Sequence, residues 1–390
     1  MTCATAAHSE PARLVVTGLF LTAPGGAEYL GCWERSRERS QQLDRRGCGV
    51  RLKLEDIGRM AGVSRSTVSR VVNGEPSVRP EVRERVEAVI RETGYTPNAA
   101  ARSLVSNRTG VIGLVIPSRV HSLFEDPYFA RLIQGVTFGS NRAGVTLSLF
   151  LAQDEDEERD LYPRVVESGF IDGVIVTATR MGDPLVERIA SSEISLVMVG
   201  RPDLGEVSYV DVDNRDGARQ AARHLVGVGA GRIGVIGAPT NTTAGTDRLE
   251  GFIEGLEELD RAIGPDLLVE GDFSEESGHA AMEVLLGRGV DAVFASSDTM
   301  ALGALRAAHE RGVVVPDDIA LMGFDGFGGS QNSVPPLTTI EQPVAHTAAR
   351  AVELLLGLVS GELSSPTSVV LPVELVERAS TDRSWIGARR

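Results

Sequence analysis

The side chains best suited to recognition chemistry lie between positions 64 and 73 of this 390-residue chain. Arg65 and Arg70 stand there among hydroxyl and amide side chains, with no carboxylate between them. A guanidinium matches the O6 and N7 acceptors of guanine, and short polar side chains can bind phosphates. The segment therefore predicts a DNA-contacting surface made of Arg65, Ser66, Thr67, Ser69 and Arg70.

Three short helices would position these residues. Apolar side chains at helical spacing predict helices over 54–61, 64–72 and 80–93. Gly62 can supply the positive φ of a tight turn, and Ser64 offers a hydroxyl N-cap. Such a pair of helices forms either a plain αα-hairpin or a helix-turn-helix, whose second helix enters the major groove. The polar outward face of the second helix favours the helix-turn-helix.

From residue 110 onward, β-branched runs alternate with helical segments. Buried strands are predicted at 111–117, 146–152, 173–178, 195–200, 232–237, 292–297 and 319–325. Helices are predicted at 128–143, 216–228, 246–259, 276–288 and 298–311. This alternation predicts parallel sheets with crossover helices, and the number of units favours two linked α/β lobes.

Ligands of open α/β sheets bind outside the carboxyl ends of the strands, and two lobes turn that edge into a cleft. Polar residues follow several of the predicted strands. The candidates at these ends are Ser118, Arg201, Ser296, Ser297, Asp298 and Asp325.

Charge is unevenly distributed along the chain. The formal net charge is −15, but residues 51–108 carry +4 and residues 109–390 carry −20. A basic segment before an acidic body is expected if only the first part meets a polyanion, although a solvated helix face can give a similar surplus.

Several chemistries find no support in the sequence. All three cysteines lie in the first fifty residues, which leaves the body without a disulfide framework or a cysteine-ligated zinc site. We find no nucleophile elbow, phosphate-binding loop or zinc-binding histidine spacing, so we expect no catalytic residue, metal or cofactor. Asp211, Asp213 and Asp216 hint at a calcium loop, but Arg215 occupies a ligand position. No apolar run is long enough to predict a transmembrane helix.

The first fifty residues show no sustained period. The run at 14–21 resembles the apolar part of a secretory signal, but the charge before it is poor. We expect residues 1–50 to be disordered or not translated, with the physiological protein beginning near Val50 or Arg51.

The segment "LEDIGRMAGVSRSTVSRVVN" at 54–73, followed by "GYTPNAAARSL" at 94–104, resembles the LacI/GalR family of bacterial transcription regulators. The resemblance implies that Arg65, Ser66 and Arg70 contact bases, while Ser64, Thr67, Ser69 and Asn73 mostly position the DNA backbone. It also implies a hinge helix within 97–108 that orders on DNA, with Asn98 and Ala101 in contact and Leu104 wedged into the minor groove. Lys53 and Arg79 depart from the serine or threonine helix caps of many members.

For the body, the resemblance implies a periplasmic-binding-protein-like architecture over 109–382, after a DNA-binding domain at 52–96 and before a tail at 383–390. The first lobe would span about 110–212 plus 343–368, and the second about 213–340 plus 369–382. The family's effector-contacting positions correspond to Tyr128, Phe129, Arg248, Phe273, Ser297 and Asp325.

Hydroxyl-rich sugars suit such a site, since Arg248 can donate and Asp325 can accept hydrogen bonds while an aromatic ring covers an apolar sugar face. A purine effector is the competing hypothesis. Thr242 and Ala244 stand where purine-sensing members have other hydrogen-bonding residues, which favours the sugar.

The predicted function is that of a cytoplasmic, nucleoid-associated transcriptional regulator, most simply a repressor. It would bind a pseudo-palindromic operator as a homodimer and respond to a small-molecule effector in the cleft. The tail lacks the leucine repeat through which some members tetramerise. The alternatives are a secreted solute-binding protein with the same lobes and, with less support, a sugar-modifying enzyme.

Overall fold

The computed structural model describes residues 52–72, 75–95, 108–119, 126–152, 155–177 and 180–384. The chain divides into two compact units, 1–97 and 98–390, and each is described by itself. The extension at 1–50, Asn73 and the hinge residues Asn98, Ala101 and Leu104 lie outside the described residues. Among the described segments, no helix is long and apolar enough to cross a bilayer.

The first unit is a group of three helices around a small apolar core. The helices are α2 (Leu54–Ala61), α3 (Arg65–Val72) and α4 (Pro80–Thr93). Ile57, Val68 and Val86 are fully buried at its centre. Gly62 ends α2 with φ at 64°, a left-handed conformation that glycine adopts without a steric cost. The three predicted helices are confirmed.

The three helices of this unit differ in how their N-terminal N–H groups are capped. The Ser64 hydroxyl accepts from the backbone N–H of Thr67 at 3.2 Å, as predicted for an N-cap. Lys53 cannot accept at the start of α2, but its backbone N–H donates to the Asp56 carboxylate at 3.0 Å. That bond is the reciprocal half of a capping box and offsets part of the lost cap. Arg79 makes no side-chain cap at α4.

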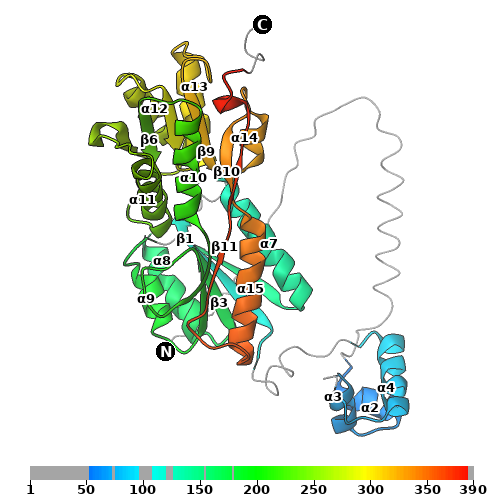
Figure 1. The fold of residues 1–390 in the computed structure, drawn as a ribbon. Helices are drawn as coiled ribbons and strands as arrows, with labels where there is room; N and C mark the ends of the chain where they lie inside the picture. Colours follow the sequence, from blue (N-terminus) through cyan, green and yellow to red (C-terminus); the bar gives the residue numbers. More distant parts are fainter. Residues whose placement is uncertain are drawn as a thin grey trace, which may run out of the picture. The chain divides into compact units, whose positions relative to one another are not determined.

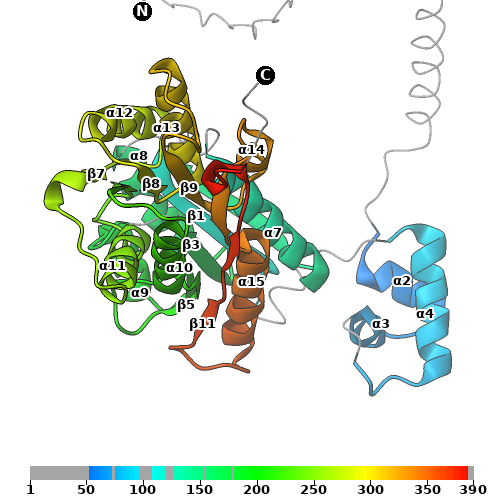
Figure 2. The same ribbon diagram turned by 45° about the horizontal axis from the view of Figure 1, so that its top comes forward.

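The second unit contains two six-stranded sheets, one in each of two lobes (Figures 1 and 2). The first sheet has the order β11-β5-β4-β3-β1-β2 and is parallel throughout. Its strands are β1 (Val111–Arg119), β2 (Thr146–Ala152), β3 (Gly173–Thr177), β4 (Ser195–Val199), β5 (Ser208–Val212) and β11 (Ser368–Leu371).

The second sheet has the order β12-β10-β9-β8-β6-β7, and only the β10–β12 pair is antiparallel. Its strands are β6 (Ile233–Gly237), β7 (Leu268–Glu270), β8 (Ala292–Ala295), β9 (Ala320–Asp325), β10 (Thr338–Glu341) and β12 (Glu374–Val376).

The chain passes between the sheets three times, after β5, after β10 and after β11. All four residues of β11 pair with β5, so this strand belongs to the first lobe. The lobe boundary expected near residue 368 falls at the start of β11, and the actual crossing follows Leu371. The pairing of Ser368 with Tyr209, far apart in the sequence, decides the lobe of β11, and no local pattern in the sequence predicts such a pairing.

Helices cover both faces of each sheet. Apolar clusters pack α7 and α15 on one face of the first sheet and α8 and α9 on the other. In the second lobe, α10 and α11 cover one face and α12 and α13 the other. The first lobe's helices are α7 (Pro127–Ala143), α8 (Glu155–Tyr162), the π-helical turn η1 (Pro163–Glu167), α9 (Pro184–Ala190) and α15 (Val344–Ser360). The second lobe's are α10 (Asn214–Gly227), α11 (Thr243–Glu257), η2 (Pro265–Leu267), α12 (Glu275–Leu286), α13 (Asp298–Glu310), α14 (Gly328–Asn332) and η3 (Ala379–Thr381). This confirms the predicted fold class, a helical head with a two-lobed α/β body.

Glycines let neighbouring helices approach closely. A Cβ placed on Gly251 of α11 would clash with the backbone oxygen of Arg215 in α10. The α12–α13 pair has the same kind of close contact, since a Cβ on Gly303 would clash with the backbone oxygen of Glu275. In the α7–α15 pair, a Cβ on Gly135 would clash with the backbone oxygen of Ala345. These contacts are between backbones, so a flexible side chain cannot relieve them.

We predict that Gly251→Ala lowers the free energy of unfolding by about 1–3 kcal/mol, because the added methyl group forces α10 and α11 apart. Gly227→Ala is the matched control at the exposed end of α10, where a Cβ meets nothing within 4 Å. It should be neutral or slightly stabilising. Urea denaturation measures both, and equal stability of the two variants would contradict the packing argument.

Candidate functional site

The first candidate surface is the exposed face of α3. Val68 and Val71 anchor the helix in the core, whereas Arg65, Ser66 and Arg70 are exposed. Thr67 and Ser69 are half-buried beside them. The Ser64 hydroxyl also hydrogen-bonds to the hydroxyls of Ser66 and Thr67, both at 2.8 Å. The structure therefore places these predicted DNA contacts together, at the start of α3 and along its solvent-facing side.

Both arginines of this face hold ion pairs with carboxylates outside α3. Arg65 lies 3.2 Å from Glu55, and Arg70 lies 3.7 Å from Glu75. More than half of each arginine side chain is exposed to solvent. Exposed pairs of this kind contribute about 0–1 kcal/mol, so DNA phosphates or bases can displace the carboxylates at little cost.

The second candidate site is a buried polar group between the lobes, centred on Arg248 of α11. Its Nε donates to Asn214 Oδ1 at 2.9 Å, and its Nη1 donates to the backbone oxygen of Ser296 and to Asp325 Oδ1, the latter at 3.4 Å. The guanidinium also lies 3.8 Å from the centre of the Phe324 ring. Arg248 and Asp325 are each 5% exposed. Arg248 and Asp325, both predicted to contact an effector, therefore form a buried pair with each other.

Asp325 ends β9 in an unusual backbone conformation. Its φ of 123° is rare for any residue other than glycine, which marks a position held by its surroundings. Gln342 Nε2 donates to its carboxylate at 2.6 Å. Burial raises the pKa of Asp325 to about 8, while the charge of Arg248 opposes that shift. The group can thus accept hydrogen bonds as a carboxylate or donate one as an acid near neutral pH.

The first lobe contributes two further acids. Asp126 caps α7 by accepting from the N–H of Tyr128 at 2.9 Å. Asp211, the penultimate residue of β5, accepts from the N–H groups of Val212 at 2.7 Å and Arg201 at 2.9 Å. Burial raises the pKa of both acids, to about 6 for Asp211, and the charge of Arg248 lowers both. Acids of both lobes therefore lie within electrostatic reach of one guanidinium.

The predicted aromatic residues have different surroundings. Burial raises the pKa of the Tyr128 hydroxyl to about 12, and the charges of Asp126, Asp211 and Arg248 act on it, so Tyr128 belongs to this group. Phe129 packs edge-on against Tyr128, with ring centres 5.4 Å apart, but 94% of its surface is buried in the first lobe's core. Phe273, half-buried with φ at 70°, packs on the core of the second lobe.

Ser297 serves a local role in the structure. Its hydroxyl accepts from the N–H of Met300 at 3.1 Å and caps α13. The neighbouring Asp298 is also buried, and it accepts from the N–H of Phe327 and the Thr339 hydroxyl. The structure thus brings together Tyr128, Arg248 and Asp325, while the interactions described for Phe129, Phe273 and Ser297 are packing and capping contacts.

Sequence reasoning missed four members of the group, namely Asp126, Asp211, Asn214 and Gln342. Asp126 stands before Pro127 and Tyr128, a helix-start pattern that predicts a cap. Asp211 lies in β5 and Asn214 follows it, and the periodicity did not predict this strand, so Asp211 was weighed only as a calcium ligand. Within the described segments, no group of three or more acidic, histidine or cysteine residues could hold a metal.

A helix-turn-helix head in the same chain as a two-lobed body with a polar interlobe site defines a ligand-responsive DNA-binding regulator. Comparisons with known proteins agree. Residues 53–98 match the family described as bacterial regulatory proteins, lacI family, and residues 222–381 match a periplasmic binding protein-like domain.

Two curated relatives resemble nearly the whole described chain. The HTH-type transcriptional regulator CelR of Thermobifida fusca is 38% identical over 333 residues, covering 84% of this chain and 97% of CelR. The HTH-type transcriptional repressor PurR of Escherichia coli O1:K1 is 35% identical, covering 84% of this chain and 96% of PurR.

Two solved structures share the fold. A transcriptional regulator CelR–cellobiose complex is 36% identical with a TM-score of 0.68, covering 85% of this chain and all of that one. The lac repressor dimer bound to operator and the anti-inducer ONPF is 28% identical with a TM-score of 0.72, covering 85% and 99%.

The chain belongs to the lacI family of bacterial regulatory proteins. It is a DNA-binding transcriptional regulator controlled by a small molecule, and not an enzyme. The alternative of a secreted solute-binding protein is not supported, because the family match includes the helix-turn-helix head.

The raised pKa of Asp211 predicts a pH dependence of stability. Between about pH 4 and pH 6 the native protein keeps a proton on this carboxyl that the unfolded chain has released. The free energy of unfolding therefore falls as the pH rises through that window, by up to about 3 kcal/mol from this group.

Asp211→Asn removes the titrating group, so the variant should gain stability relative to the wild type between pH 4 and pH 7. Urea denaturation of both proteins across that range measures the difference. A difference that stays constant with pH would show that Asp211 has an ordinary pKa.

Proposed function

We propose that the protein is a repressor that binds a pseudo-palindromic operator as a homodimer, in the cytoplasm and at nucleoid DNA. We propose further that an uncharged sugar is its effector and binds between the lobes. The observation that carries this proposal is the buried Arg248–Asp325 pair, surrounded by acceptors and acids from both lobes.

The proposed base contacts are Arg65, Ser66 and Arg70, at the exposed start and middle of α3. Ser64, Thr67, Ser69 and Asn73 would position the DNA backbone. Asn98, Ala101 and Leu104 would act from the hinge, with Leu104 opening a base step in the minor groove. The lac repressor structure, a dimer bound to operator, supports the homodimer and the paired half-sites.

The chemistry of the interlobe group favours a ligand rich in hydroxyl donors. Asp126 and Asp211 outnumber the single guanidinium of Arg248 even when Asp325 keeps its proton, so an anion such as a sugar phosphate would meet net repulsion. Neutral hydroxyl groups can donate to these acids and accept from Arg248. The CelR–cellobiose complex supports a disaccharide as the first candidate.

A purine effector has less support. The Thr242 hydroxyl accepts from the N–H of Gly245 at 3.1 Å and donates to the oxygen of Pro239 at 2.8 Å, so the cap of α11 uses it. Ala244 offers no side-chain hydrogen bond.

The proposed effector site is completed by aromatic and hydroxyl surfaces, which would come from Tyr128, Phe129, Phe273 and Ser297.

The effector would act by shifting the equilibrium between two arrangements of the lobes. Arg248 and Asp325 are nearly inaccessible, so a ligand that reaches them requires the lobes to separate and close again. It can shift this equilibrium only by its difference in affinity for the two arrangements. A change in lobe orientation would then alter the spacing of the paired hinge segments on DNA.

We predict that cellobiose binds the wild-type protein in isothermal titration calorimetry and that Asp325→Asn weakens binding about tenfold or more. Asparagine keeps the shape of aspartate but replaces one acceptor oxygen with an amide group, and a buried hydrogen-bonding group left without its partner costs about 1–3 kcal/mol. Asp266→Asn, on the exposed surface of the second lobe, is the control. Binding of hypoxanthine in place of cellobiose would refute the sugar.

We predict that Arg70→Ala reduces discrimination at one operator base pair by about 1–3 kcal/mol, as expected for lost bidentate base contacts. Electrophoretic mobility shifts on a set of single-base operator variants measure it. Arg91→Ala, in the last turn of α4, removes the same charge outside α3. Equal weakening by Arg70→Ala on every sequence would make Arg70 a phosphate contact.

A further inference from the structure

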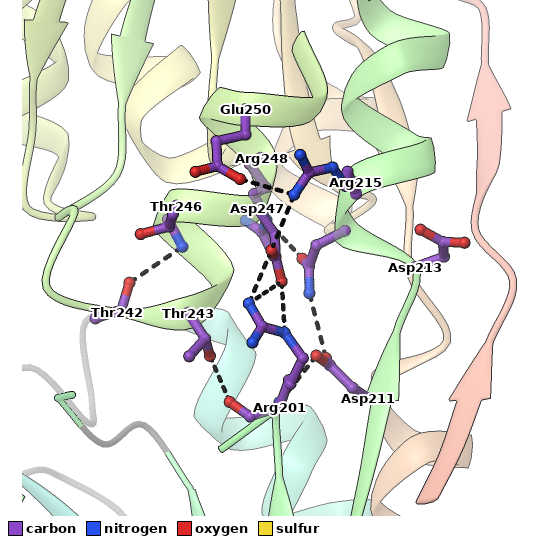
Figure 3. Close-up of polar contacts among 12 residues, drawn as sticks. Arg201, Asp211, Asp213, Arg215, Thr242, Thr243, Thr246, Asp247, Arg248 and Glu250 are labelled. Atoms are coloured by element: carbon purple, nitrogen blue, oxygen red, sulfur yellow. Dashed lines mark hydrogen bonds and ion pairs between the residues drawn. The ribbon is translucent and has the colours of Figure 1, made fainter. Parts of the chain in front are cut away.

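An ion pair joins the two lobes beside the proposed effector site (Figure 3). Arg201, in the first lobe just after β4, contacts Asp247 of α11 in the second lobe through two nitrogens. Nε lies 3.1 Å from Oδ2, and Nη2 lies 2.9 Å from both carboxylate oxygens. This two-pronged geometry fixes the relative orientation of both groups, which a single contact cannot do.

Backbone contacts reinforce the same junction. The Thr243 hydroxyl donates to the backbone oxygen of Arg201 at 2.6 Å, and the N–H of Met181 donates to the backbone oxygen of Asn241 at 2.8 Å. Both contacts join a loop of the first lobe to the segment that begins α11. Three separate interactions thus converge on residues 241–247.

The junction lies beside the first crossing between the lobes. Arg201 follows β4, which neighbours β5, and the chain crosses directly after β5. The backbone N–H of Arg201 donates to Asp211 of β5, and Arg215, near the start of α10, lies 3.9 Å from Asp247. The ion pair therefore adds a side-chain contact to a region where the backbone already joins the lobes.

Asp247 is held in place from within its own lobe. Only 13% of its side chain is exposed, and Arg215 of α10 lies 3.9 Å from it on the side away from Arg201 (Figure 3). Arg215 in turn pairs with Glu250 at 2.7 Å and with Glu254. The carboxylate is therefore oriented toward Arg201 before the lobes close, which lowers the entropy lost on pairing.

The pair also adjoins the effector group on both sides. The backbone N–H of Arg201 donates to Asp211, and Asp247 directly precedes Arg248. We propose that Arg201 and Asp247 are positioning residues that latch the closed lobes and slow effector release without touching the effector. This inference rests on the proposed interlobe effector site.

The test compares Arg201→Gln, Asp247→Asn and the double variant in the full chain. Stopped-flow release of bound cellobiose should be about threefold to fivefold faster in each single variant, the range of an exposed ion pair. The double variant should match the single ones, because the second substitution removes nothing more. Arg223→Gln, which breaks a similar pair with Glu258 inside the second lobe, should release cellobiose at the wild-type rate.

A second measurement needs no ligand. Spin labels at Glu187→Cys in α9 and Glu257→Cys in α11 report the distance between the lobes, after Cys3, Cys32 and Cys48 are replaced by serine. Breaking the pair should lengthen and broaden the distance distribution by pulsed electron resonance.

Unchanged distances in the double variant would overturn the latch, and so would additive effects of the two single substitutions on cellobiose release. Longer distances with an unchanged release rate would also overturn it, since the pair would then not govern effector retention. If the wild-type protein fails to bind cellobiose, the proposed sugar is wrong, and the distances alone decide whether the pair closes the lobes.

Discussion

A guanidinium removed from water must be surrounded by acceptors, and this requirement shapes the middle of the body. Arg248 obtains them from the start of α10, the residue after β8 and the end of β9. An unpaired buried charge costs several kcal/mol, so these three segments are held in one arrangement as long as Arg248 stays between them. The charge of the same guanidinium also lowers the pKa of Asp126 and Asp211 in the first lobe, so it acts on acids of both lobes.

The same constraint links ligand binding to lobe movement. A ligand that satisfies Arg248 and Asp325 must displace or share their present partners, and it gains most when the first-lobe acids also reach it. The ion pair between Arg201 and Asp247 adds a peripheral contact that does not depend on the ligand. Affinity then reflects both the direct hydrogen bonds and the ease with which the lobes close.

Local patterns in the sequence sufficed for the head and for most strands. The β-branched run at 146–152 became β2 at its predicted bounds, and the apolar stripe of 54–61 became α2. β5 and α15 were not predicted as elements. β5 is short and carries Ser208 and Asp211 among its apolar residues, which weakens its pattern. The buried residues of α15, such as Val344, Ala348 and Ala351, recur at helical spacing, so this helix could have been predicted. Arg248 and Asp325 were predicted through a family resemblance. Asp211, Gln342 and the Arg201–Asp247 pair depend on contacts between distant positions, which no local pattern records.

Diffraction from crystals grown with cellobiose tests the central claim most directly. The account predicts density for the sugar between the lobes, with its hydroxyl groups within hydrogen-bonding distance of Arg248 and Asp325 on one side and of Asp126 or Asp211 on the other. A sugar bound elsewhere, or an interlobe site where Arg248 keeps all its present partners in the presence of saturating sugar, would contradict it.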